Sequence, residues 1–189
     1  MAETFEHSYN KAEHFAGIGQ YAEALAWYDK AIAIRPEYPD TWISRGIAFN
    51  ELGRHAEAAD SCDKAIALQP DEPVAWINRG VALGKLGRSA EALASFDRAI
   101  ALNPKFAGAW MFRGVALGEL GRYSEAVDAY DRGIDLYPDF DEVWYNRGIA
   151  LCKLGKYAEA AASYDKALRI NPDHAGAKKN REIAIALKK

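Results

Sequence analysis

The sequence predicts an all-α protein, an α-solenoid of five helical hairpins followed by a C-terminal capping helix. Three observations lead to this fold class. The 189 residues are 50% hydrophobic and rich in alanine, with only 7 prolines and few β-branched runs, a composition that favours helices. Glycine recurs every 34 residues, at Gly19, Gly53, Gly87, Gly121 and Gly155. Proline recurs at the same interval, at Pro36, Pro70, Pro104, Pro138 and Pro172.

The 34-residue period reflects internal duplication. Residues 39–72 and 73–106 are identical at 19 of 34 aligned positions, whereas unrelated segments share about two. The five units follow one another, at 5–38, 39–72, 73–106, 107–140 and 141–174. Residues 175–189 begin like a sixth unit, and we expect a helix over Ala175–Leu187 that caps the array with one polar face.

Each unit is expected to fold as two antiparallel helices. We number its positions from 1 to 34 and expect the first helix over positions 2–14 and the second over positions 18–31. The glycine at position 15 supplies a left-handed backbone turn that ends the first helix. The proline at position 32 ends the second helix, because it cannot continue the helical hydrogen bonding. A single hairpin cannot bury its apolar surface alone, so the five are expected to stack around a continuous core.

A recurring set of residues gives the units a family likeness. Tryptophan stands at unit position 4, glycine at 8, alanine at 20, an aromatic residue at 24, alanine at 27 and proline at 32. In the third unit these residues are Trp76, Gly80, Ala92, Phe96, Ala99 and Pro104. The pattern resembles the tetratricopeptide repeat family over residues 5–174, and the resemblance implies a right-handed solenoid that binds other proteins. The chain departs from it locally, at Ser8, Ala12, Cys62 and Gly133.

The glycine at position 8 has a packing role that follows from the hairpin itself. Positions equally distant from the turn lie at the same height, so Gly80 is expected to face Phe96. The missing side chain on one helix leaves room for the ring on the other, and the two helices can approach closely.

Positions 7 and 25 carry opposite charges in every unit. Position 7 is Lys11, Arg45, Arg79, Arg113 or Arg147, and position 25 is Asp29, Asp63, Asp97, Asp131 or Asp165. A partly buried arginine needs an anionic partner, and the two positions lie level across the hairpin. We therefore predict ion pairs within each unit: Lys11–Asp29, Arg45–Asp63, Arg79–Asp97, Arg113–Asp131 and Arg147–Asp165. In the alternative, each arginine pairs with an acid of the adjacent unit.

The first helices carry a second apolar stripe that their own hairpins do not cover. The family resemblance implies that this face lines a concave groove, at unit positions 2, 5, 9, 12 and 13. The predicted groove residues are Ile43, Ile47, Asn50, Ile77, Asn78, Val81, Met111, Val115, Tyr145, Asn146 and Ile149. One interpretation is a binding groove for an apolar peptide or helix, with small residues at position 12 leaving space. The other is that these side chains fill contacts between successive first helices.

No group of residues predicts catalysis, a metal site or a cofactor. His7 and His14 are two helical turns apart, too far to share a metal ion without another ligand. Cys62 falls on a core position, and nothing near Cys152 in the sequence suggests an activated thiol. The glycines of residues 79–84 recur with the packing motif and lie within a helix, so they are not a phosphate-binding loop.

Charge and hydropathy narrow the expected partners. The formal net charge of −3 argues against nucleic acid, and no apolar run is long enough to cross a membrane. Residues 1–11 lack a secretory apolar core, and two distant cysteines do not form a disulfide framework, so we expect a cytoplasmic protein.

The expected function is a non-enzymatic scaffold or adaptor for protein–protein interaction. A basic clamp for acidic chaperone tails is excluded, because position 2 is acidic or uncharged in every unit. Acidic residues at the rim favour apolar, neutral or basic segments; they are Glu6, Glu13, Asp40, Glu51 and Glu142. The alternative function is self-assembly into dimers or higher oligomers through the apolar stripe or the capping helix.

Overall fold

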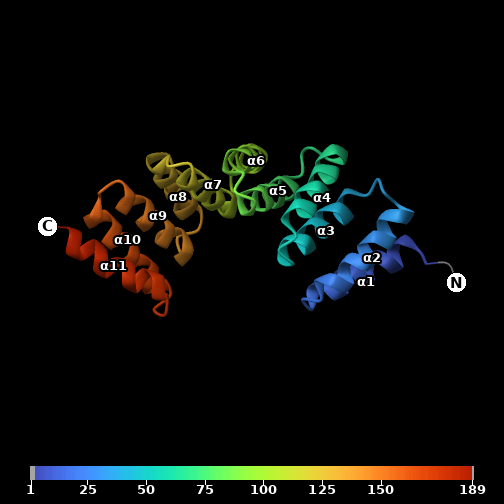
Figure 1. Cartoon of the computed structure of the whole chain (residues 1–189), viewed down its shortest axis with the longest axis horizontal. Helices are drawn as coiled ribbons and strands as arrows, with labels where there is room; N and C mark the ends of the chain where they lie inside the picture. Colours follow the sequence, from blue (N-terminus) through green and yellow to red (C-terminus); the bar gives the residue numbers. More distant parts are fainter. Residues whose placement is uncertain (1–2, 189) are drawn as a thin grey trace. The chain divides into compact units, whose positions relative to one another are not determined.

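The computed structural model describes residues 3–188, which form eleven α-helices and contain no β-strand (Figure 1). The first helices of the hairpins, which we call the A helices, are α1 (Phe5–Gly17), α3 (Pro39–Glu51), α5 (Pro73–Lys85), α7 (Ala107–Glu119) and α9 (Asp141–Lys153). The second, or B, helices are α2 (Tyr21–Ile34), α4 (His55–Leu68), α6 (Ser89–Leu102), α8 (Tyr123–Leu136) and α10 (Tyr157–Ile170). The last helix, α11 (Ala175–Leu187), is a sixth A helix.

The predicted all-α repeat fold is confirmed. Each helix of the five hairpins begins and ends one residue before the predicted positions, and α11 has the predicted bounds. The glycine at position 15 adopts the expected left-handed conformation in all five units, with φ between 72° and 77°. Lys189, the end of the predicted capping segment, lies outside the described residues.

The helices form two compact units, Met1–Leu102 and Asn103–Lys189, which we call the N-terminal and C-terminal units. Within each unit, the A helices of successive hairpins contact one another, as α3 and α5 do. Within each of these units, over residues 3–188, the B helices contact A helices only. Each stack is therefore closer on its A side, and the A helices form its inner face.

The predicted packing of glycine against an aromatic ring is confirmed. A Cβ atom placed on Gly80 would lie 2.5 Å from Phe96 Cε1, and one on Gly148 would lie 2.5 Å from Tyr164 Cε1. Phe96 and Tyr164 are buried. In the second unit, Cys62 replaces the ring, and its Sγ would lie 2.8 Å from a Cβ on Gly46.

The role of Gly80 leads to a test with a control one turn away on the same helix. Replacing Gly80 with leucine is expected to lower the free energy of unfolding by about 3 kcal/mol, because the new side chain displaces the buried ring of Phe96. Replacing Gly84 with alanine should instead raise it by up to about 1 kcal/mol, since that Cβ meets only Ala92 Cβ at 3.9 Å and alanine favours the helix. Urea unfolding monitored by circular dichroism measures both changes. Equal effects at the two glycines would contradict the packing argument.

For Arg45, Arg79 and Arg147, the predicted ion pair within the unit is wrong, and the alternative, a pair with an acid of the adjacent unit, is correct. These three arginines donate from Nε to the aspartate of the preceding unit: Arg45 to Asp29 at 2.8 Å, Arg79 to Asp63 at 2.6 Å and Arg147 to Asp131 at 2.6 Å. Lys11 lies over the ring of Trp27 instead of pairing with Asp29. The side chain runs toward the neighbouring hairpin, because the A helix packs between its own B helix and the preceding one.

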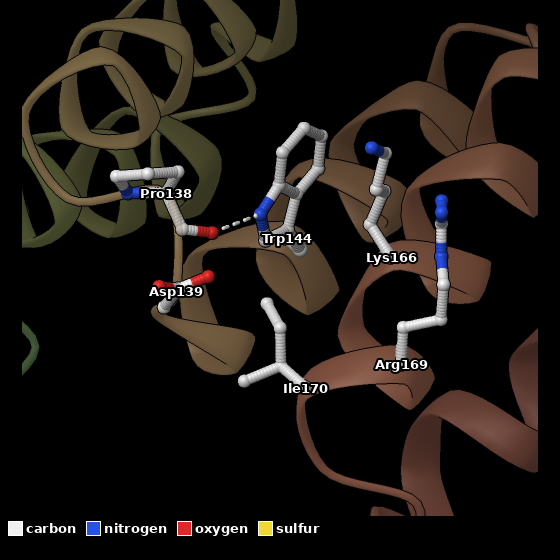
Figure 2. Close-up of a pocket in the computed structure, with 6 residues that line it drawn as sticks. All are labelled: Pro138, Asp139, Trp144, Lys166, Arg169 and Ile170. Carbon is white, nitrogen blue, oxygen red and sulfur yellow. Dashed lines mark hydrogen bonds between the residues drawn. The ribbon is translucent and has the colours of Figure 1, made fainter.

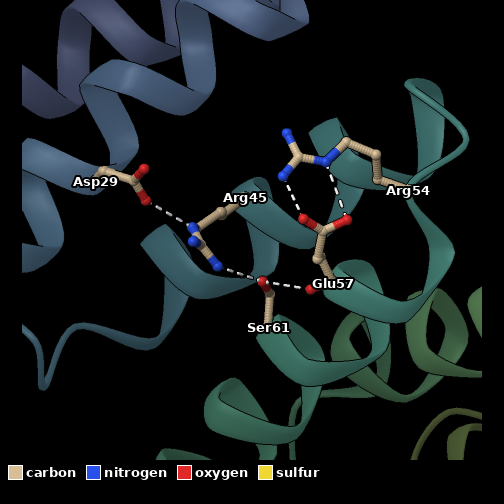
Figure 3. Close-up of polar contacts among 5 residues, drawn as sticks. All are labelled: Asp29, Arg45, Arg54, Glu57 and Ser61. Carbon is tan, nitrogen blue, oxygen red and sulfur yellow. Dashed lines mark hydrogen bonds and ion pairs between the residues drawn. The ribbon is translucent and has the colours of Figure 1, made fainter.

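The same arginines also bind their own hairpin. Arg45 Nη1 donates to Ser61 Oγ at 2.8 Å, and Ser61 in turn donates to the Glu57 backbone oxygen (Figure 3). Arg79 and Arg147 repeat this contact with Ser95 and Ser163. Each arginine therefore links the B helices of two successive hairpins.

Helix α11 continues the array by one half-hairpin. Arg181 donates from Nε to Asp165 Oδ1 at 2.5 Å, which extends the series of arginine–aspartate pairs. Ala177 and Ala184 are buried against the last hairpin, whereas Ile183, Ile185 and Leu187 are exposed. Among residues 3–188, no helix is both long and apolar enough to span a membrane.

Candidate functional site: two hollows on the inner face

A hollow of about 380 Å³ opens on the inner face of the C-terminal unit, between α7 and α9. Val115 and Ile149 supply apolar wall, and Gly118 leaves the space open, since no side chain other than those of its chain neighbours lies within 4 Å of its Cβ position. Glu119 and Lys153 place opposite charges at the rim. The remaining lining residues are Tyr123, Tyr130, Asn146 and Ala150.

A second, smaller hollow of about 200 Å³ lies between α9 and α11. Ile149 and Lys153 border both hollows. The other lining residues are Cys152, Tyr164, Asn180 and Ile183. All six of its lining residues stand one repeat after a lining residue of the first hollow, so the site is periodic like the fold.

The hollows combine apolar walls with amides and neutral phenols. Burial raises the pKa of Tyr130, with a further rise from the nearby Glu119 carboxylate. Burial also raises the pKa of Tyr164, whose hydroxyl lies 3.7 Å from Cys152 Sγ. Both phenols are therefore uncharged near neutral pH. Such walls can bury apolar side chains of a ligand, while Asn146 and Asn180 can hydrogen-bond its backbone.

In the N-terminal unit, part of the predicted groove is used for packing between hairpins. Ile43 and Ile77 are both only 7% exposed, and Ile43 belongs to a core cluster with Ala65 and Ala75. Ile47 and Val81 are half-buried. The two interpretations of the stripe thus apply to different residues. Ile43 and Ile77, at position 5 of the second and third repeats, belong to the core.

The predicted asparagines of the N-terminal unit are engaged within the protein. Asn50 Nδ2 donates to the Asn78 backbone oxygen at 3.1 Å, and its Oδ1 faces His55 Nδ1. Asn78 Nδ2 donates to the Val74 backbone oxygen. Asn50 stands where Gly118 leaves space in the C-terminal unit, so this side chain occupies the corresponding region.

Met111 and Tyr145 complete the predicted set in the C-terminal unit. Both are half-buried. The Tyr145 ring centroid lies 4.4 Å from that of His174, and its hydroxyl accepts a hydrogen bond from Asn180 at 3.4 Å. Tyr145 is therefore partly covered by the start of α11. Asn180 and Ile183 were not among the predicted residues, although they stand 34 positions after Asn146 and Ile149.

Two acids of the predicted rim are engaged within the first hairpin. Glu13 accepts a hydrogen bond from the Tyr28 hydroxyl at 2.7 Å, and Glu6 pairs with Arg35 at 3.4 Å. In the part of the chain that the structure describes, no three His, Cys, Asp or Glu side chains are placed to hold a metal ion.

Models of known protein families match these repeats. Two models described as tetratricopeptide repeat match the chain, one over residues 77–139 and 116–175 and the other over residues 39–72. A further model, described as TPR repeat, matches residues 16–53. A comparison with curated protein sequences gave no match.

Several solved structures have the same fold. YrrB, described as a TPR protein with an unusual peptide-binding site, is 24% identical with a TM-score of 0.79, over 96% of this chain and 100% of YrrB. MamA from Desulfovibrio magneticus RS-1 is 21% identical with a TM-score of 0.83, over 93% of this chain and 99% of that one. A chain of the APC/C hetero-tetramer Cut9–Hcn1 is 21% identical with a TM-score of 0.84, over 96% of this chain and 36% of that one.

Proposed function

The chain belongs to the tetratricopeptide repeat family, and from this premise we propose that it is a non-enzymatic adaptor that binds a partner protein on its inner face. Tetratricopeptide repeats generally mediate protein–protein interaction. The observation that carries the proposal is the pair of adjoining hollows at repeat-related positions, with apolar walls and an asparagine amide in each. The surface is formed by helices, so little ordering is required on binding.

The partner segment is expected to be apolar and neutral to basic. Val115, Ile149 and Ile183 offer apolar contact area in the two hollows. Neighbouring helix axes lie about 8–10 Å apart, which corresponds to about three residues of an extended peptide or seven of a helix. One bound segment can therefore place side chains in both hollows. The rim acid Glu142, which belongs to the same compact unit as the hollows, adds a preference against acidic segments.

The decisive experiment uses two valines of equal exposure. Val115 is 38% exposed and lines the first hollow, whereas Val74 is 39% exposed and lines neither hollow. Partners are captured from a cell extract, and the bound segment is mapped with overlapping peptides. Val115→Glu is expected to weaken binding of the mapped peptide about tenfold or more, because a carboxylate then replaces apolar contact area. Val74→Glu should leave the affinity unchanged.

Both variants should retain the helix content and melting temperature of the unmodified chain, since both valines are exposed. Equal affinity of the Val115→Glu variant and the unmodified chain would remove the hollows from the binding surface. Ile77 is unsuitable for such a test because it is buried, and a charge there would destabilise the fold.

A second candidate function is self-assembly through α11. Ile185 is 46% exposed, whereas Leu151, at the same repeat position one unit earlier, is fully buried by its own B helix. Ile183 and Leu187 add apolar surface. Docking of a second copy would cover this face. Sedimentation at several concentrations should then show dimers that Ile185→Lys abolishes, and a concentration-independent monomer would eliminate this candidate.

We also propose that the protein is cytoplasmic. Cys62 and Cys152 are both free thiols, as is usual in a reducing compartment. Fractionation of cells that produce the chain tests this assignment.

A further inference from the structure

A third hollow, of about 480 Å³, lies away from the inner face, where the end of α10 meets the start of α9. Figure 2 shows its six lining residues: Pro138, Asp139, Trp144, Lys166, Arg169 and Ile170. The Trp144 indole donates from Nε1 to the Pro138 backbone oxygen at 2.8 Å, which fixes the ring. We call this hollow the edge site. It shares no lining residue with the two inner hollows.

Most of the edge site is repeat architecture. Two repeats earlier, the corresponding residues are Pro70, Asp71, Trp76, Arg98, Ala101 and Leu102. Trp76 Nε1 likewise donates to the Pro70 backbone oxygen, at 2.9 Å. The aspartate stands at position 33 of the preceding unit in both cases, as Asp71 and Asp139, and position 26 is basic in both hairpins. The two sites therefore differ in charge at a single position, where Arg169 stands in place of Ala101.

Arg169 departs from the repeat pattern, and its contacts within the protein do not explain why an arginine stands there. The same position is Ala33, Ala67, Ala101 and Asp135 in the four preceding units. The arginines at position 7 bind aspartates of the fold, whereas no hydrogen bond or ion pair joins Arg169 or Lys166 to another described residue. Lys166 Nζ lies 5.8 Å from the Trp144 ring centroid, and both cations are exposed.

The arrangement of these groups defines a complementary ligand. In Figure 2, Lys166 and Arg169 lie on one side of the hollow, Asp139 lies on the other side, and Trp144 and Ile170 lie between them. An apolar side chain can pack on the tryptophan ring and Ile170. A neighbouring carboxylate can then reach the guanidinium group of Arg169, which binds carboxylates with two parallel hydrogen bonds.

We propose that the edge site binds an acidic segment of a partner protein through one apolar side chain and an adjacent carboxylate. This partner chemistry is opposite in charge to that expected on the inner face. The chain as a whole carries a net charge of −3, so this pair of cations is a local exception that can select an acidic segment. The edge site and the inner face could thus bind two different segments at once.

The test selects peptides that bind the unmodified chain but not a variant lacking Arg169. Random dodecapeptides displayed on phage are bound to the unmodified chain, and binders of the Arg169→Ala variant are removed. The surviving peptides are expected to combine acidic and apolar residues. Their affinity, measured by fluorescence anisotropy, should fall about tenfold or more in Arg169→Ala and less in Arg169→Lys, which keeps the charge but loses the paired hydrogen bonds. Val115→Glu should leave this affinity unchanged.

The third unit offers a gain-of-function control. Adding Ala101→Arg to the Arg169→Ala variant places an arginine among Pro70, Asp71, Trp76 and Arg98, and it should restore binding of the same peptides. The melting temperature of each variant should match that of the unmodified chain, because Arg169 and Ala101 are exposed. Selected peptides that bind Arg169→Ala with full affinity, or that carry no acidic residues, would overturn the proposal. So would binding that Ala101→Arg fails to restore.

Discussion

Raising the pH above about 10 is expected to unfold the chain cooperatively. Tyr28, Tyr130 and Tyr164 are almost completely buried, and burial is the main cause that raises the pKa of each phenol well above its usual value. Burial likewise raises the pKa of the Cys62 thiol to about 12. The folded state therefore holds these protons more tightly than the unfolded state does.

The sign of the effect follows from proton linkage. Below the pKa of the unfolded groups, about 10 for tyrosine and about 8.5 for cysteine, both states are protonated and stability does not depend on these groups. Above it, the unfolded state loses protons that the folded state retains, so each group lowers the free energy of unfolding by about 1.4 kcal/mol per pH unit. Three tyrosines and one cysteine together remove about 8 kcal/mol by pH 11, a large part of the stability of a typical domain.

Tyrosinate absorbance and far-ultraviolet circular dichroism, recorded during the same titration, measure this transition. Ionisation of the buried phenols should coincide with loss of helix. Tyr130→Phe should move the transition to higher pH, because it removes one of the ionising groups. Full ionisation of all tyrosines with intact helix content would show that the phenols are accessible to hydroxide, in contradiction to their burial.

Replacing Tyr164 with alanine is expected to lower the free energy of unfolding by about 3–5 kcal/mol. The ring is 1% exposed and fills the space that Gly148 leaves on α9. Its removal opens a cavity between α9 and α10 and exposes the packed surfaces of Leu151 and Ala167 to it. Tyr164→Phe keeps the ring and should cost less than about 1 kcal/mol, since the hydroxyl interacts with the weakly hydrogen-bonding Cys152 sulfur and the half-buried Asn180 amide, and the phenyl ring still packs.

A double-mutant cycle separates this pair from general destabilisation. Gly148→Leu alone should be destabilising by overpacking, and Tyr164→Ala alone by cavity formation. Combined, the leucine occupies part of the space that the ring has left, so the double variant should be more stable than the sum of the single effects predicts. Urea unfolding of the four proteins provides the comparison. Strict additivity would mean that the two residues do not share one packing space.

The sequence allowed most of the fold to be predicted, because every element is repeated. Gly80 and Phe96 could be placed opposite each other from the turn position alone, since both belong to one hairpin. The partner of Arg79 could not be chosen in the same way. Asp63 and Asp97 stand at the same repeat position, and only the packing of α5 against α4 decides in favour of Asp63.

The candidate site could be predicted only in part, because the stripe on the A helices has two uses. Ile77 and Val115 are both apolar residues of this stripe, yet Ile77 is core and Val115 lines a hollow. Their exposure depends on the distance between successive A helices, which cannot be predicted from the sequence of one hairpin alone. Whether position 12 leaves a hollow also depends on the next hairpin: Asn50 fills the space there by binding the Asn78 backbone, whereas Gly118 leaves it open.

The arginine–aspartate pairs have a consequence for the history of such a chain. Each copy of the unit carries a donor for the copy before it and an acceptor for the copy after it, as Arg45, Asp63 and Arg79 do in sequence. A duplicated unit therefore already contains both the arginine and the aspartate that pair with its neighbours. The array can lengthen by whole units without any new residue at the interfaces between them.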